Sequence, residues 1–448
     1  THTGNVVIGK TAAGNGAFTA DNNVIIGKES SLSMTTGSSN TIMGADSAKT
    51  ITEGHSSVII GQNAGAALTT GHSVVFIGQA AGDNHDTEHD NLAIGRAALG
   101  GPVAGGEFNV AIGNYSLDAL TSADNCVAIG YNAGSAITSG TGNILIGLEA
   151  GSSITEGQYG TFIGYHAGKE RTTGGDTIGI GFQALKTSDT ETHNIAIGLN
   201  ALRLANGGGE YNVAIGNNAL DALTSADFCT AVGYQAGSAI DTGAYNTLIG
   251  HQSGDAITSG NTNTAVGHGS LGTLTQGDRN TAVGSGALGT FNPSGNTDDS
   301  NTAVGYAAGN EITTGVFNIA FGGLALGGAV TTENRNMAIG YASMSANIAG
   351  GEYNVCVGNH TGGSLTSGDY NTTLGYNAGS ALTTGVRNVI IGSNAGDAMV
   401  QGSSNVIIGD EALGGGVFTS SKLVAIGRNA GFDLTSANNT TLVGYEAG

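Results

Sequence analysis

The chain has 448 residues, and its formal net charge of −21 arises from 34 acidic residues against only 13 lysines and arginines. That balance repels phosphate backbones, which argues against nucleic acid as a partner. Glycine supplies 80 residues but not at every third position, and only two prolines occur, so the chain is not a collagen. No apolar run reaches the roughly 18 residues that span a bilayer, so membrane insertion is not expected.

A glycine preceded by an apolar residue recurs through the whole chain, from Gly9 to Gly444. It appears 26 times, and of the 25 intervals 18 are 17 residues long, six are 18, and one, from 284 to 305, is 21. A short period kept from end to end indicates one small unit stacked many times. The sequence therefore predicts a single continuous repeat domain over residues 1–448. The chain opens on Thr1 rather than Met and shows no signal peptide, which indicates a processed or partial chain.

Positions are numbered here from the recurring glycine, which is position 0. Residues at −3 to −1 are short, mostly β-branched and apolar, as in Thr264-Ala265-Val266, and position −1 is apolar in all 26 repeats. Such a segment, bounded by glycine and polar residues, is typical of a β-strand. We therefore predict an all-β, parallel β-solenoid of about 26 coils. At about 4.8 Å per coil it would form a rod roughly 125 Å long.

The two faces of this strand indicate an oligomer. Side chains at −1 and −3 point to one side, and those at −2 and −4 to the other. None of the four positions carries a charge in any repeat, whereas a face in water would collect charges. We expect one face to fill the coil and the other to pack on neighbouring copies. We expect threonines at −3, such as Thr264, Thr281 and Thr302, to face inward, which leaves the alanine-lined side against the sister chains.

Position −4 is Asn in 18 of the 26 repeats. Asparagines stacked at one coil's spacing can hydrogen-bond from coil to coil, so we predict a buried ladder; an array that binds sugar is the functional alternative. Position +3 is always Ala, Ser or Thr, because only a small side chain fits where the chain doubles back tightly. An apolar residue usually follows at +7, which suggests a second short strand and a turn that closes the coil. Two strands and two turns in 17 residues fit a flattened two-strand roll.

The extra residues of the longer repeats fall in the turn that closes each coil, and residues 292–299 form the longest insertion. Variation confined to one corner indicates that this corner faces solvent and would hold any specific binding site.

The string NTAVGYAAG at 301–309, and the Val-Ala-Ile-Gly segments Val110–Gly113 and Val127–Gly130, recur at this fixed period. They resemble the YadA-like head of trimeric autotransporter adhesins and the repeat region of bacteriophage and bacterial tail-fibre proteins. The resemblance covers essentially the whole chain. It implies a left-handed parallel β-roll with three chains side by side, on a virion or cell surface. Adhesin heads use shorter repeats, and residues 1–448 contain no coiled-coil heptads, membrane anchor or chaperone domain.

Few residues suggest chemistry. The acidic turn 83–90 holds three Asp, one Glu and two His, which could bind a divalent cation or form a solvated loop, and Asp298-Asp299 is a weaker candidate. Glu107, Glu210 and Glu352 lie six and eight coils apart, too far to form the acid and base of a glycosidase, whose carboxyls lie within about 10 Å. No phosphate loop, zinc spacing or nucleophile motif occurs. We expect no enzyme, no catalytic or metal residue and no cofactor.

Cysteine and tyrosine are two other residue types that could carry a function. Three cysteines cannot build a disulfide framework, and Cys126 and Cys229 are expected to fill the core. Tyrosine at position +1 can stack on sugars or cap the edge of the roll. Ice binding by threonine arrays is disfavoured because we expect those threonines to face inward. Seven tyrosines occupy position +1: Tyr131, Tyr165, Tyr234, Tyr306, Tyr341, Tyr376 and Tyr445.

The sequence therefore favours a structural fibre or shaft, for which the resemblance implies a trimer, in an extracellular or virion appendage. Two alternatives remain open: a cell-surface adhesin whose closing turns, such as 83–90 or 291–300, bind a receptor or glycan, and a filament subunit that stacks end to end.

Overall fold

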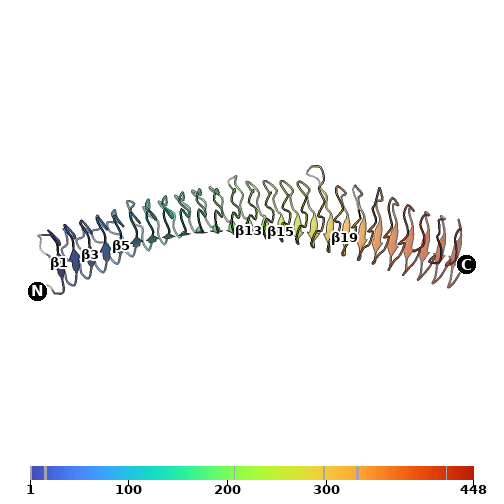
Figure 1. Ribbon diagram of the computed structural model, residues 1–448, viewed down its shortest axis with the longest axis horizontal. Coiled ribbons are helices and arrows are strands. Elements are labelled where there is room, and N and C mark those ends of the chain that lie inside the picture. Colours follow the sequence, from blue (N-terminus) through green and yellow to red (C-terminus); the bar gives the residue numbers. More distant parts are fainter. Residues whose placement is uncertain (1–2, 15–17, 206, 296–297, 329–331, 420) are drawn as a thin grey trace. The chain divides into compact units, whose positions relative to one another are not determined.

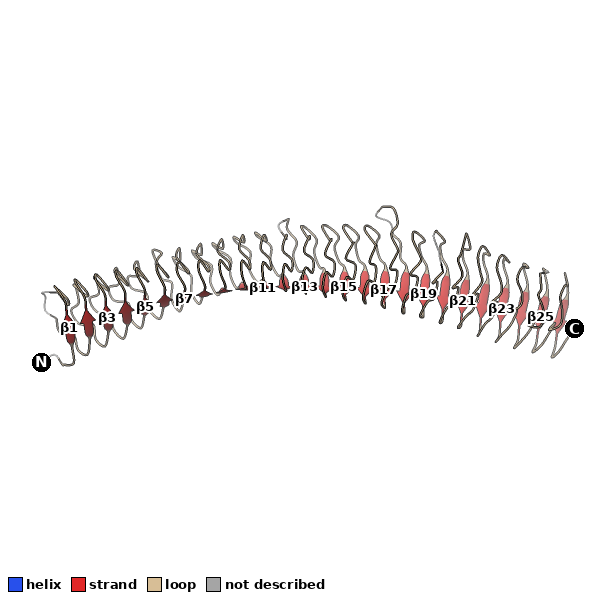
Figure 2. Cartoon of the chain, viewed as in Figure 1, coloured by secondary structure: helices blue, strands red, loops and turns tan. Residues whose placement is uncertain are grey.

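The computed structural model describes residues 3–14, 18–205, 207–295, 298–328, 332–419 and 421–448. It contains two compact units, residues 1–225 and 226–448. In the described residues each unit is built only from short strands, turns and bends, wound into successive coils (Figure 1). Within each unit the strands line one side of the stack and the closing turns line the other (Figure 2). The predicted all-β parallel solenoid is confirmed.

Every strand has three residues and occupies positions −3 to −1 of its coil. The strands of the first unit are β1 (Val6–Ile8), β2 (Val24–Ile26), β3 (Thr41–Met43), β4 (Val58–Ile60), β5 (Val75–Ile77), β6 (Leu92–Ile94), β7 (Val110–Ile112), β8 (Val127–Ile129), β9 (Ile144–Ile146), β10 (Thr161–Ile163), β11 (Ile178–Ile180), β12 (Ile195–Ile197) and β13 (Val213–Ile215). Those of the second unit are β14 (Thr230–Val232), β15 (Thr247–Ile249), β16 (Thr264–Val266), β17 (Thr281–Val283), β18 (Thr302–Val304), β19 (Ile319–Phe321), β20 (Met337–Ile339), β21 (Val355–Val357), β22 (Thr372–Leu374), β23 (Val389–Ile391), β24 (Val406–Ile408), β25 (Val424–Ile426) and β26 (Thr441–Val443).

Within each unit successive strands pair in parallel, with each position opposite the same position of the next coil. In the first unit Val6 faces Val24, and in the second Thr264 faces Thr281. The glycine at position 0 continues this ladder, as when the Gly27 N–H donates to the Ile8 carbonyl at 2.8 Å. Because equivalent atoms lie above one another, any residue that fits one coil must also fit against its own copy.

The predicted second strand is absent from the described residues, and this detail of the prediction is wrong. The side opposite the strand is a run of turns in which residues at +2 and +4 have positive φ, for example Asn63 at 57° and Gly65 at 56°. Positive φ interrupts an extended chain. Hydrogen bonds between coils persist nevertheless: Asn63 N–H donates back to the Ala45 carbonyl (3.0 Å) and Gly65 N–H donates forward to the Ala81 carbonyl (2.9 Å). Backbone N–H and C=O groups on this side therefore find their hydrogen-bond partners in the equivalent turns of the adjacent coils.

The asparagine ladder at position −4 is confirmed, and its side chains are buried. The Asn371 Oδ1 accepts the backbone N–H of Asn388 at 3.1 Å and its Nδ2–H at 3.0 Å. The Asn371 Nδ2 also donates to the Gly385 carbonyl of the closing turn at 2.8 Å. Each amide thus joins one coil to the next and the strand side of the coil to its closing turn.

The core is thin, and large side chains are matched by glycine on the facing wall. Phe76, at −2, is fully buried, and a Cβ added at Gly82 would lie 2.7 Å from its ring. Where position −2 is alanine, as at Ala93, position +4 is often leucine, as at the fully buried Leu99. The alternation between alanine and larger residues at −2 therefore reflects volume complementarity inside the coil.

Among the described residues, three buried polar residues occupy the core position +7, where most coils have Leu or Ile: His85, Arg171 and Ser188. Arg171 is fully buried, and its guanidinium donates to the Gly174 carbonyl (3.1 Å), the Ser188 hydroxyl (3.0 Å) and the Thr177 hydroxyl (3.2 Å). Burial lowers the pKa of Arg171 to about 10. His85 is also fully buried and lies edge-on to Phe76, with 5.0 Å between ring centroids. Neither ring nitrogen of His85 has a hydrogen-bond partner among the residues that the structure describes.

The longest coil, between β17 and β18, carries a prominent loop (Figure 1). As predicted for a closing turn, Asn292, Ser294 and Asp298 are exposed. Asp299 is instead buried, and its Oδ2 accepts the Asp278 N–H at 3.1 Å and the Asn280 Nδ2–H at 3.4 Å. This carboxylate takes the place of the backbone carbonyl that other coils offer to the asparagine ladder.

The position-0 glycine gives the first testable prediction. Gly267 has φ +135°, and an added Cβ would lie 2.6 Å from the carbonyl carbon and oxygen of Gly284. Gly267→Ala should therefore destabilise the second unit by about 3 kcal/mol or more, measured by urea denaturation with circular dichroism. Gly444→Ala is the matched control, because φ is again +135° but its Cβ would meet only Ala447 at 3.9 Å. Equal losses in the two variants would show that steric stacking is not what requires glycine.

The asparagine ladder gives the second testable prediction. Asn371→Ala leaves the buried Asn388 N–H without its acceptor and the buried Gly385 carbonyl without its donor. It should therefore lower the free energy of unfolding by about 3 kcal/mol. Asn371→Cys should cost less, because Cys126 occupies the same position and its Sγ donates to the Gly140 carbonyl at 3.2 Å. The same urea denaturation measures both. Two variants as stable as the parent would contradict a structural role for the ladder.

Candidate functional site

The exposed side of each strand is the principal candidate surface. Side chains at −5, −3, −1 and +1 of a coil are exposed or half-buried in nearly every repeat, whereas those at −4 and −2 are buried. These four columns are called the strand face below. The alanines at −2, such as Ala265 and Ala303, are 0% exposed and lie in the core, whereas Thr264 is half-buried on the outside.

The structure thus reverses the predicted orientation of the strand. The alanine-lined side faces the coil interior, and the threonines at −3 face outward. The reason is the thin core, in which the turn side approaches the −2 side chain closely enough to favour alanine. Because the threonines face outward, their orientation does not count against ice binding.

Exposed large apolar and aromatic side chains gather on the strand face. Of those among the described residues, all except Val7, Val417 and Phe432 belong to its four columns. The middle columns, −3 and −1, hold aliphatic residues, threonine, two methionines and one phenylalanine, Phe321, with no charge. The outer columns, −5 and +1, hold most of the aromatic rings. The exposed ones are Phe108, Tyr159, Tyr211, Phe228, Tyr245, Phe317, Tyr353 and Tyr370 at −5, and Tyr131, Tyr165, Phe182, Tyr234, Tyr306, Tyr341, Tyr376 and Tyr445 at +1.

Charge is distributed unequally between this face and the rest of the surface. The strand face carries eight of the 13 basic residues and three of the 34 acidic ones, a balance of +5. All other positions together therefore carry −26. The basic residues are Lys10, Lys28, Arg96, Arg279, Arg335, Arg387, Lys422 and Arg428, and the acidic ones are Asp90, Asp176 and Asp410.

Rings and guanidinium groups stack along the −5 column. In the second unit Tyr353 and Tyr370 lie parallel with centroids 5.0 Å apart, and Arg335 lies over both Phe317 (5.2 Å) and Tyr353 (5.5 Å). Arg387 continues the column over Tyr370 at 5.7 Å. This column was not predicted from the sequence, although the aromatic residues that recur directly before the asparagine could have revealed it.

The side chains of the acidic turn 83–90 point in different directions and do not form one cluster. His85 points into the core, and Glu88 is only 4% exposed and turns back to accept the Asp86 N–H (2.9 Å) and the Gly105 N–H (3.0 Å). His89 points outward and pairs with Asp90 (2.8 Å) and Glu107 (2.9 Å). Burial, with Asp118 nearby, raises the pKa of Asp83. Among the described residues, no three His, Cys, Asp or Glu side chains are arranged to bind a metal ion.

The three glutamates at −6 reach back to the preceding coil. Glu107 contacts His89, Glu210 accepts from the Thr192 hydroxyl (3.0 Å), and Glu352 accepts from the Asn334 amide (2.9 Å). A second set at position −7 was missed by the sequence analysis. Its members are nearly buried, and each accepts the N–H of a glycine in the following, longer closing turn: Glu88, Glu191 and Glu333. Both sets support the turns.

The predicted burial of the cysteines is confirmed. Cys126, Cys229 and Cys356 are buried and unbridged. Burial raises the pKa of the Cys229 thiol to about 11 and that of Cys356 to about 12. Thiols with raised pKa values in the core are poor nucleophiles.

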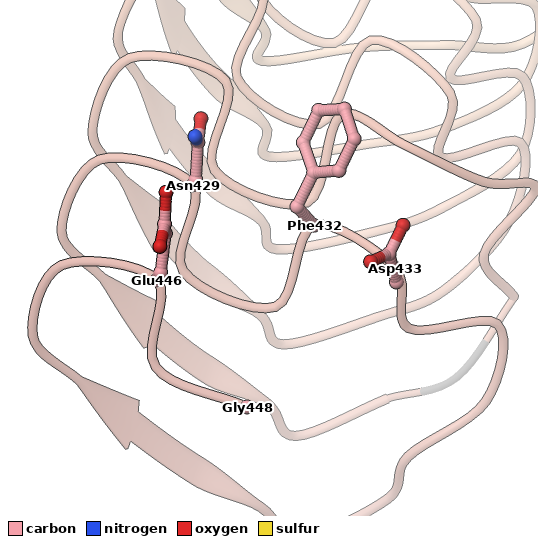
Figure 3. Close-up of a pocket in the computed structure, with 5 residues that line it drawn as sticks. All are labelled: Asn429, Phe432, Asp433, Glu446 and Gly448. Carbon is pink, nitrogen blue, oxygen red and sulfur yellow. The ribbon is translucent and has the colours of Figure 1, made fainter.

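A hollow of about 230 Å³ lies at the end of the last coil, lined by Asn429, Phe432, Asp433, Glu446 and Gly448 (Figure 3). These residues surround the uncovered side of that coil, where Gly444 has no coil stacked on it. The hollow therefore reflects the end of a stack.

The chain matches no known family model and no curated protein. Within the described residues, no helix has the length and apolar character needed to cross a membrane.

His85 gives the third prediction. Burial lowers its pKa to about 3, against about 6.5 in the unfolded chain. The folded state therefore loses stability as the pH falls below 6.5, by about 2–3 kcal/mol at pH 4.5. His85→Leu should remove this loss and stabilise the first unit at both pH values, measured by urea denaturation at pH 7 and 4.5.

Leu120→Met changes the same core position in another coil without a titratable group, and should retain the pH dependence of the parent. An unchanged pH dependence in His85→Leu would show that His85 is not the group responsible.

Proposed function

We propose that this chain is a structural shaft protein in which copies associate side by side through their strand faces. The observation that carries the proposal is the concentration of exposed apolar and aromatic side chains on one of the surfaces of the coil. Contiguous apolar surface of this kind is characteristic of protein–protein contact. The acidic remainder of the surface would then face water, where its charge keeps shafts apart.

The repeat makes such an interface additive. Each coil contributes the same two uncharged columns at −3 and −1, and apolar burial contributes about 25 cal/mol per Å². A modest gain per coil therefore grows with the number of coils in contact. The flanking arginine and aromatic columns at −5 and +1 form the rim, where charge is tolerated at little cost.

Three copies, a left-handed coil and a tail-fibre or similar extracellular appendage follow from the resemblance to tail-fibre and adhesin-head repeats. The proposed role is mechanical, since within the described part of each unit successive coils are hydrogen-bonded on both the strand side and the turn side. A role as an adhesin head is a second candidate, favoured by the aromatic columns that reach the edges of the strand face.

Lysines placed in the middle columns test the shaft directly. Val266→Lys with Val283→Lys should convert the oligomer into 44 kDa monomers in sedimentation velocity, because two charges per copy would be buried without partners. Gln276→Lys with Ser367→Lys adds the same charge at exposed closing turns and should leave the oligomer intact. A parent chain that sediments as a monomer, or a strand-face variant that sediments like the parent, would contradict the proposal.

A further inference from the structure

The +1 column of the second unit is interrupted at one coil. Tyr234, His251 and His268 occupy +1 in three successive coils and stack with ring centroids 5.1 Å apart at each step. The next coil has Ser285 at this position, and the following one has Tyr306. The column therefore lacks one ring between His268 and Tyr306.

The surface beside this gap is bare of side chains. Position +2, which is Asn or Gln in many coils, is Gly269 and Gly286 in these two. A Cβ added at Gly269 would meet nothing within 4 Å, and one at Gly286 would meet only the Asn310 Oδ1 at 3.8 Å. The result is an open hollow of about 360 Å³, which also reaches Gly289, Thr290 and Asn310.

Tyr306 is unusual among the tyrosines at +1. Its side chain is 68% exposed, the highest value in this set, and it has no ring contact within the described part of the chain. Tyr131, Tyr165, Tyr234, Tyr341 and Tyr376 each contact another ring. Tyr445, in the last coil, is 65% exposed and also has no ring contact within the described residues, so Tyr306 is the one unstacked tyrosine at +1 that lies between two coils. A large, unstacked ring next to a vacant position is the arrangement expected where a ligand completes a stack.

The neighbouring coil provides an internal comparison. Gly323 also leaves position +1 empty, between Tyr306 and Tyr341. There the Tyr341 ring leans over the vacancy, with its Cδ2 3.5 Å from a Cβ added at Gly323. Only the gap at Ser285 belongs to the hollow.

We propose that this gap binds the ring of an uncharged sugar between His268 and Tyr306. Two coils separate these rings, about 9.6 Å at the usual spacing of parallel strands. A ring midway between them would lie about 4.8 Å from each, within the range of ring stacking.

Polar groups select a sugar over an apolar ring. Ser285, Thr290 and Asn310, which carry hydroxyl and amide groups, line the hollow, so that a ligand with hydroxyls around its edge meets polar partners. The Thr290 hydroxyl already donates to the Asn310 carbonyl, so Thr290 can serve such a ligand only as an acceptor. The net charge of −21 disfavours phosphorylated or acidic sugars. The hollow extends from the rim of the strand face over positions +2 to +6, outside the middle columns through which copies would associate. This binding site goes beyond the proposed shaft and does not depend on it.

The test uses saturation-transfer NMR on the whole chain, with the methyl glycosides of glucose, galactose, mannose and N-acetylglucosamine as probes, and with adenosine and p-cresol as aromatic competitors. At least one glycoside should bind. Ser285→Tyr restores the missing ring, and Gly286→Asn (φ 67° at Gly286) installs the residue found at +2 in other coils; each should weaken binding about tenfold or more.

Ser393→Tyr is the matched control, because Ser393 is also an exposed serine at +1. It should leave glycoside binding unchanged, and circular dichroism of all three variants should match the parent. The proposal would be overturned if no glycoside bound, if binding survived both Ser285→Tyr and Gly286→Asn, or if only adenosine or p-cresol bound. Sedimentation of the same samples reports separately on the shaft, so failure of one proposal is distinguishable from failure of the other.

Discussion

The structure depends on one constraint: within each unit, equivalent backbone atoms of successive coils lie directly above one another. Parallel pairing at equal positions leaves no room for a Cβ at position 0, which is why the glycine recurs with φ near +140°. The same constraint gives a buried asparagine a copy of itself as its partner in the next coil. It also stacks aromatic rings at about one coil's spacing along the outer columns. The sequence therefore repeats because each coil imposes the same steric requirement on the next one.

Much of the fold could be predicted because this constraint is visible in single residues. The glycine and the three residues before it located the strands correctly, and the asparagine at −4 indicated the ladder. The turn side was misread because a single apolar residue at +7 is compatible with both a short strand and a turn that buries one side chain, and positive φ at a residue such as Asn63 leaves no clear mark in the sequence. The sequence pattern also did not reveal that side-chain volumes on the two walls of the coil depend on each other. Phe76, for example, fits because residue 82, six residues later in the same coil, is glycine.

The candidate surfaces were harder to predict. Absence of charge at four positions correctly marked the strand, but it did not distinguish the core side from the outer side, because both are apolar. The turn 83–90 resembled a cation site only because His85 and Glu88 are adjacent in sequence to outward-facing residues; the fold turns both into the protein. The gap at Ser285 has no signal in a single repeat, since it exists only relative to the rings of the coils before and after it.

Taken together, the surfaces of the coil have separate roles in the proposed shaft. The strand face provides apolar contact, the acidic remainder provides repulsion between shafts, and the gap in the +1 column at Ser285 provides a place for a ligand. The closing turns accept insertions because buried carboxylates such as Asp299 and Glu88 replace lost backbone contacts.

The central claim is that strand faces of different copies lie together. Spin labels attached to Ser393→Cys, at the rim of the strand face, and to Ser367→Cys, at a closing turn, test it most directly, because the three native cysteines are buried. Double electron–electron resonance should give a shorter distance between the labels of two copies for Ser393→Cys than for Ser367→Cys. Absence of dipolar coupling at Ser393→Cys, or a shorter distance at Ser367→Cys, would contradict the account.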